Sequence, residues 1–197
     1  MHRILVAGCL AALPLRATSA LVTTTIAAPE VWSQALALLK PSASEVHLSA
    51  SSLPGGVWFD VLDPGLGIRL TGRPAANGIV KFNGRAGSAL AFEARPLDQT
   101  QPPSGYLFVS RTLSARVVRS GEGFILEGQA GGKPLALMLQ RGSGPHDYEV
   151  IGRDGSRLEA RITPSYARLR GRFDPKRMSP EGLAVLGASV ALMFPNG

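Results

Sequence analysis

The sequence has little of what catalytic and metal-binding sites are built from. Its 197 residues include one cysteine, Cys9, and only three histidines. No group of His, Cys, Asp and Glu residues has the spacing of metal ligands. The stretch 142–145 (GSGP), which precedes His146, lacks the strand-to-helix setting of a nucleophile elbow. We therefore predict a non-enzymatic domain that uses no metal or cofactor.

Long apolar runs are also missing. No 18 consecutive residues are apolar, so we predict no transmembrane helix. Hydrophobic residues make up 45% of the chain and charged residues 18%, a balance that excludes a disordered or fibrous protein. The 23 glycines and 15 prolines instead favour many short strands joined by tight turns.

The first twenty residues have the composition of a targeting segment. His2 and Arg3 precede an apolar stretch at 4–15, and small residues at 18–20 suit a cleavage site. We predict a signal segment at 1–20 and a single β-rich domain at 21–197. This signal would direct the protein to the secretory pathway or outside the cell; the alternatives are import into a plastid or other organelle, or a peripheral membrane location. Residues 6–9 also resemble a lipobox, in which Cys9 would carry a lipid.

Most of the chain after residue 56 alternates apolar and polar residues, which is typical of strands with one buried face. A further strand is expected around 46–48, and a short helix, begun by Pro29, before it. Gly, Asn, Asp and Pro residues separate the segments. The predicted strands lie near 57–62, 67–72, 78–83, 89–94, 105–110, 113–119, 123–128, 134–140, 147–152, 157–162 and 166–173.

One predicted helix, at 180–194, has no polar face. The thirteen residues from Gly182 to Phe194 carry no charge, so this helix should be buried on every side. A sheet of so many strands avoids bare edges by closing, and a barrel of ten or more strands is too wide for side chains alone to fill. We predict a mostly β fold: a closed antiparallel barrel of about 10–12 strands around this helix. A stripe of small residues would allow the helix to approach a strand closely: Ala184, Gly187, Ala188 and Ala191.

Positive charge is concentrated in the second half of the chain. Residues 111–197 carry thirteen basic and eight acidic side chains, whereas residues 21–110 carry six of each. Arg168, Arg170 and Arg172 share one side of the predicted strand 166–173, and Arg157 and Arg161 lie on the strand before it. Arginine forks suit phosphate oxygens, so we predict an anionic partner for these five residues. A solvated outer face of the barrel is the alternative interpretation.

The C-terminal part resembles the tubby-like superfamily, which includes tubby domains, plant LURP-one-related proteins and phospholipid scramblases. The similarity lies in the basic strand YARLRGRF and the following SPEGLAVLGASVALMF, with a compatible run of strands before them. The resemblance implies a barrel of about twelve strands around a hydrophobic helix. It also implies a domain that binds phosphoinositides or other anionic lipids, or acts as a scaffold for a protein partner, through the same five arginines.

Three other functions stay open at this point. The phrase TTTIAAPEVW at 23–32 looks like the opening of helix-grip (START-like) domains, which carry a hydrophobic small molecule under an amphipathic helix. Asp60, Asp63 and Glu93 could form the carboxylate pair of a secreted glycoside hydrolase. Nucleic-acid binding is the least favoured, because few aromatic residues accompany the basic ones: only Tyr166 and Phe173 do so.

Overall fold

The computed structural model describes residues 45–52, 58–153 and 155–194. The predicted signal segment 1–20 and the predicted helix after Pro29 lie outside these residues. The described part belongs to one compact unit. Its strands are β1 (Glu45–Ser52), β2 (Phe59–Asp63), β3 (Ile68–Pro74), β4 (Val80–Ala86), β5 (Ser88–Pro96), β6 (Gly105–Val109), β7 (Leu113–Ser120), β8 (Gly123–Ala130), β9 (Lys133–Arg141), β10 (Asp147–Gly152), β11 (Arg157–Ile162) and β12 (Ala167–Arg172). The short 3-10 helix η2 (Ala76–Gly78) lies between β3 and β4, and the helix α3 (Pro180–Met193) follows β12.

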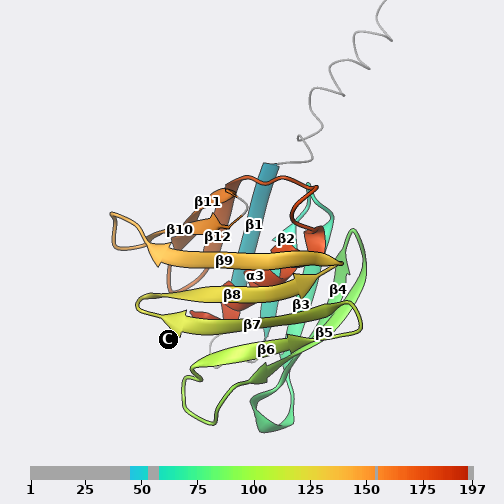
Figure 1. Ribbon diagram of the computed structural model, residues 1–197. Coiled ribbons are helices and arrows are strands. Elements are labelled where there is room, and N and C mark those ends of the chain that lie inside the picture. The colour runs from blue at the N-terminus through green and yellow to red at the C-terminus, as the bar shows by residue number, and fades with distance from the viewer. Residues whose placement is uncertain (1–44, 53–57, 154, 195–197) are drawn as a thin grey trace, which may run out of the picture. The chain divides into compact units, whose positions relative to one another are not determined.

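The strands form a closed antiparallel barrel (Figure 1). Each strand pairs with its neighbours in the sequence, and β1 pairs with β12, so that Leu48 lies opposite Leu169. Each strand turns alternate side chains inward, as the alternating burial of β11 and β12 shows. The predicted barrel around a C-terminal helix is confirmed. The helix-grip alternative is wrong, because the twelve strands join into a barrel around the helix.

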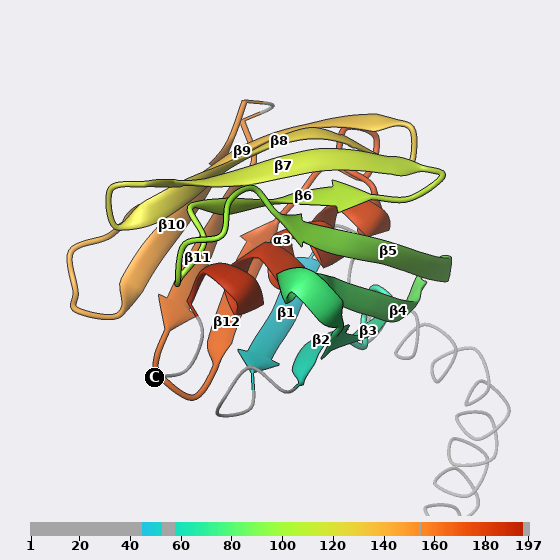
Figure 2. The same cartoon turned by 90° about the horizontal axis from the view of Figure 1, so that it is seen from below.

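The helix α3 fills the barrel (Figure 2). Every residue from Gly182 to Met193 is buried, as its lack of a polar face predicted. Its N-terminus is capped by Ser179, whose Oγ accepts a hydrogen bond from the Gly182 N–H (3.1 Å) and donates one to the Ala130 carbonyl (2.8 Å). At the other end, Arg119 donates to the Met193 carbonyl at 2.8 Å. A backbone group at each end of the buried helix therefore has a side-chain partner.

Within the small-residue stripe of α3, Gly187 packs closely against β1 and β2. A Cβ atom added there would lie 2.4 Å from Val61 Cγ1 and 3.1 Å from Leu48 Cδ2. We expect Gly187→Ala to lower the free energy of unfolding by about 1–3 kcal/mol through overpacking, although alanine is the better helix former by about 1 kcal/mol. Urea unfolding measures this change.

The double variant Gly187→Ala/Val61→Ala tests whether the overlap is the cause. Val61→Ala removes the methyl group nearest the new Cβ and one of the next two, so the two changes should destabilise by less than the sum of the single variants. Strictly additive losses would show that Gly187 is not in tight contact with β2.

The loop at 97–104, between β5 and β6, is held by Asp98. Its carboxylate accepts hydrogen bonds from the Thr100 N–H (3.0 Å) and from the Ser104 and Thr100 hydroxyls. These bonds, of which the one from Ser104 has the largest effect, lower the pKa of Asp98 to about 2, from an ordinary 3.8. The loop at 97–104 is thus an ordered part of the domain.

A pH titration of Asp98 tests this arrangement. Because the pKa is lower in the folded protein than in the unfolded chain, the stabilisation is complete above the ordinary pKa and is lost as the pH falls toward 2. The carboxyl carbon of Asp98, followed by NMR, should titrate near pH 2, and Ser104→Ala should raise that pKa. Titration of the unmodified protein near 3.8 would show that the hydroxyls do not hold the carboxylate.

Candidate functional site

The five predicted arginines lie together on the outer surface of β11 and β12. Arg161 is opposite Arg168, and Arg157 is opposite Arg172. Arg170 lies between them on β12 and faces Glu159 of β11. These side chains point outward because Leu158, Ala160 and Leu169 alternate with them and are buried in the core.

Acidic side chains also occupy this surface. Glu149 of β10 pairs with Arg157 (Oε1 to Nη1, 3.3 Å), Asp147 lies opposite Arg161, and Glu45 lies opposite Arg172. The alternation of one strand predicts which residues share its outer face, but it says nothing of the residues on the next strand. The surface is therefore less basic than the sequence of β12 alone suggested.

A shallow hollow of about 540 Å³ lies over part of this surface. Arg161, Arg168 and Arg170 contribute to its lining, together with Asp147 and Glu159. Arg168 is stacked over the ring of Tyr166, with 4.9 Å between the guanidinium carbon and the ring centre. A ligand in the hollow could therefore contact three guanidinium groups and the ring of Tyr166.

The strand register extends this basic surface in a direction that the sequence did not indicate. Arg168 lies opposite Ser49, Ser49 opposite Leu62, Leu62 opposite Arg69, and Arg69 opposite Arg85. We call the resulting line across β11, β12, β1, β2, β3 and β4 the arginine row: Arg161, Arg168, Ser49, Leu62, Arg69 and Arg85. It contains four arginines, and the Leu62 side chain near its centre is 41% exposed. Beyond Arg161 the line continues to Asp147 of β10.

Sequence reasoning missed Arg69 and Arg85 because the first half of the chain has no net charge. The alternation Ile68-Arg69-Leu70 does place Arg69 on an outer face, so the signal was present strand by strand. Neighbouring cations of β3 and β4 have partners: Arg73 lies over the Trp58 ring at 4.5 Å, and Lys81 is 3.8 Å from Glu93. Within the described residues, Arg69 and Arg85 have no ion-pair partner.

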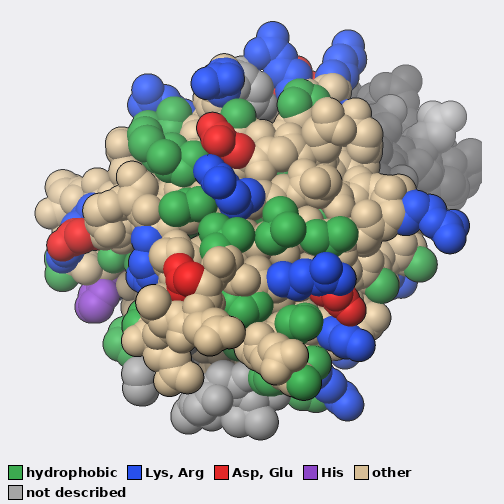
Figure 3. All heavy atoms as spheres, turned by 60° about the horizontal axis from the view of Figure 1, so that its bottom comes forward, with side chains coloured by type: hydrophobic (Ala, Val, Ile, Leu, Met, Phe, Trp, Pro, Cys, Tyr) green, Lys and Arg blue, Asp and Glu red, His purple; other side chains and the backbone are tan. Residues whose placement is uncertain are grey.

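Other parts of the outer surface carry apolar or mixed side chains. A line of outward apolar residues crosses β7 to β10: Val118, Ile125, Met138 and Ile151. On the face shown in Figure 3, Lys and Arg side chains lie among hydrophobic, neutral and acidic ones. Positive charge is therefore unevenly distributed over the surface, and the arginine row is one of the places where it gathers.

The three carboxylates considered for a hydrolase, those of Asp60, Asp63 and Glu93, do not lie together at one site. Asp60 is exposed on β2, while Asp63 is fully buried. Glu93 lies on β5, three strands further around the barrel, where a hydrogen bond from Arg95 lowers its pKa. In the described ranges, no cluster of three or more His, Cys, Asp or Glu residues has a geometry for a metal ion, and no helix there has the length and apolar character needed to cross a membrane.

Comparisons of the chain with protein-family models, with curated proteins and with solved structures find no match.

Proposed function

We propose that the protein is a non-enzymatic tubby-like domain that docks on anionic membrane surfaces through the arginine row. One observation carries the proposal: four outward arginines share one line across six neighbouring strands, on either side of an exposed leucine. The tubby-like resemblance, which stays a prediction, points to the same class of partner.

Two like-charge contacts within the row favour an anionic partner. Arg161 faces Arg168, and Arg69 faces Arg85, each across one strand pair. Such facing charges destabilise a sheet unless a counter-ion lies between them. Neighbouring strands are about 4.8 Å apart, so one phosphate can accept hydrogen bonds from both guanidinium groups of a pair. Lipid headgroups supply phosphates in a plane, which suits an extended line of cations.

Apolar and aromatic side chains near the row favour a membrane over a soluble polyanion. Leu62 lies in the row beside Arg69, and Tyr166, which is 38% exposed, contacts Arg168. Leucine and tyrosine are suited to the boundary between headgroups and acyl chains. A single-stranded nucleic acid would instead need several exposed aromatic rings for stacking along its path.

Vesicle cosedimentation of the full chain tests the proposal. Binding is expected to vesicles that contain phosphatidylserine or phosphatidylinositol bisphosphate, and not to phosphatidylcholine alone. It should weaken strongly between 0.1 M and 1 M salt, where the screening length falls from about 10 Å to about 3 Å. The proposal fails if no anionic vesicle binds, if salt has no effect, or if a DNA duplex competes as well as the vesicles do.

A further inference from the structure

The barrel wall has an opening beside the first residues of β9. On one side, β9 pairs with β8 from Lys133 to Leu139. On the other side, its pairing with β10 begins only at Leu137. The sole backbone bond before that point in the described residues is from the Arg153 N–H to the Ala136 carbonyl, at 3.0 Å. Residues 133–136 therefore have no strand partner on this side.

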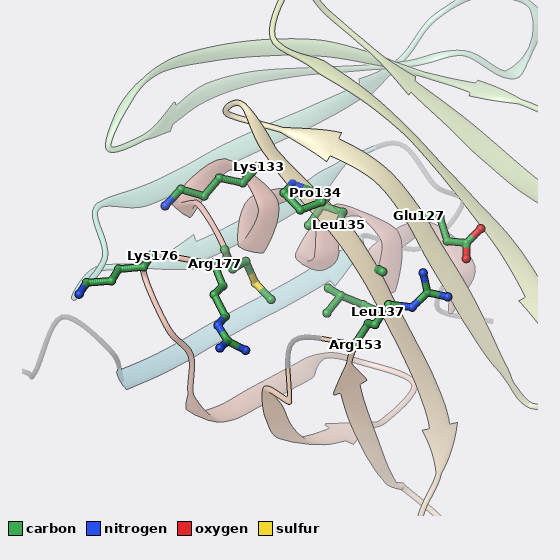
Figure 4. Close-up of a pocket in the computed structure, with 10 residues that line it drawn as sticks. Glu127, Lys133, Pro134, Leu135, Leu137, Arg153, Lys176 and Arg177 are labelled. Carbon is green, nitrogen blue, oxygen red and sulfur yellow. The ribbon is translucent and has the colours of Figure 1, made fainter.

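The segment between β12 and α3 lies along this opening and turns it into a groove of about 610 Å³ (Figure 4). Met178, which is buried, forms part of its floor with the edges of Leu135 and Leu137. The ring of Pro134 and the methyl group of Ala136 add further apolar surface. The groove thus has a size and an apolar base typical of small-molecule sites.

The remaining lining of the groove is cationic. Lys133, Arg153, Lys176 and Arg177 line it, with Glu127 as the single acid. In Figure 4, Lys133 and Lys176 lie toward one end of the groove, while Arg153 and Glu127 lie at the other. An anion is therefore favoured at the lysine end, and an apolar group along the base.

The ammonium groups of Lys133 and Lys176, at that end, can donate hydrogen bonds to a ligand. The Lys133 ammonium donates one hydrogen bond to the Pro175 carbonyl, which holds it at the groove and leaves two of its three protons for a ligand. Lys176 has no ion-pair partner among the described residues, whereas Arg177 is 3.6 Å from Asp174. The lysine pair is thus the part of the groove suited to a carboxylate or phosphate.

A peptide strand is a poor occupant of this opening. The Ala136 carbonyl points to the open side, because it accepts the bond from Arg153. Pro134, two residues earlier, points the same way, and proline has no N–H to donate. At Pro134 the exposed edge therefore lacks the donor that an added strand would need.

We propose that the groove binds a single-chain anionic amphiphile, with its alkyl chain along Pro134, Ala136 and Met178 and its acidic head at Lys133 and Lys176. The head is a carboxylate or a phosphate, as in a fatty acid or a lipid with one acyl chain. This site goes beyond membrane docking by the arginine row, and it shares no residue with that row.

Calorimetric titration of the full chain with decanoate, decyl phosphate, decanol and inorganic phosphate, all below micelle formation, tests the proposal. Decanoate or decyl phosphate should bind, and the tighter of the two identifies the head. Decanol and inorganic phosphate should each bind at least about tenfold more weakly, because each lacks one half of the interaction. Decanol or inorganic phosphate binding as tightly as the amphiphiles would overturn the proposal.

Variants locate the site. Lys133→Gln/Lys176→Gln should weaken binding of the charged amphiphiles by about tenfold or more and leave decanol unchanged. Ala136→Trp, at a half-buried outward position, should fill the groove and abolish binding, while thermal unfolding confirms that it folds. Lys81→Gln on β4, and glutamine at all four arginines of the row, should have no effect. Undiminished binding by Ala136→Trp, or equal loss in Lys81→Gln, would refute the site.

Discussion

Changing Arg69, Arg85, Arg161 and Arg168 together to glutamine should weaken binding to anionic vesicles by about a hundred- to a thousandfold. Each arginine near an anionic membrane surface contributes about 1 kcal/mol, and every 1.4 kcal/mol is a factor of ten in affinity. The four side chains are exposed and project from the sheet, so the barrel should keep its stability. Cosedimentation at low salt, over a range of lipid concentrations, measures the change.

A matched variant removes the same number of charges elsewhere. Glutamine at Arg95, Arg111, Arg116 and Arg141, all exposed and all outside the row, lowers the net charge equally. This control should lose less than about tenfold in affinity if the position of the charge decides binding. Equal losses in both variants would show that only net charge matters, and the arginine row would not be the docking surface.

Asp63→Ala should be the most destabilising single change of a charged residue. The Asp63 side chain is fully buried, and its carboxyl accepts hydrogen bonds from the His47 N–H (2.7 Å) and the Leu66 N–H (3.1 Å). It thereby ties the start of β1 to the turn between β2 and β3. Alanine would leave both N–H groups without a partner, and each unsatisfied buried donor costs about 1–3 kcal/mol. Urea unfolding should show a loss of about 2–4 kcal/mol.

Two further variants separate this explanation from a general effect of lost charge. Asp60→Ala, three residues earlier on the outer face of β2, should change the free energy of unfolding by no more than about 0.5 kcal/mol. Asp63→Asn keeps one acceptor oxygen and should fall between the unmodified protein and Asp63→Ala. If Asp60→Ala and Asp63→Ala were equally destabilising, the two backbone hydrogen bonds would not be the reason.

The strands and the helix could be predicted because their signals are local. Alternation within each strand shows which side faces the core, and a helix with no polar face must be surrounded. Turn residues mark most strand ends, and Asn77, at a positive φ of 59°, is one such position. Closure then followed from the number of strands, because an open sheet of that size would have two bare edges.

The candidate sites could not be predicted in full because they depend on register. Arg85 meets Arg69 and Leu62 meets Ser49 only through cross-strand pairing, which no single segment encodes. The acidic neighbours of Arg157 and Arg161 were missed for the same reason. The groove depends on β10 stopping short of the start of β9, and strand lengths are among the features that a sequence defines least.

The helix α3 comes after all twelve strands in the sequence, so the ribosome synthesises the strands before the helix that packs inside them. Until α3 emerges, inward phenylalanines and leucines of the sheet lack the surface on which they pack. Pairing of β1 with β12 also joins distant parts of the chain, and long-range contacts of this kind slow folding. The core is therefore completed only after all twelve strands have been made, and any change that delays the docking of α3 prolongs the time for which this apolar surface is open to aggregation.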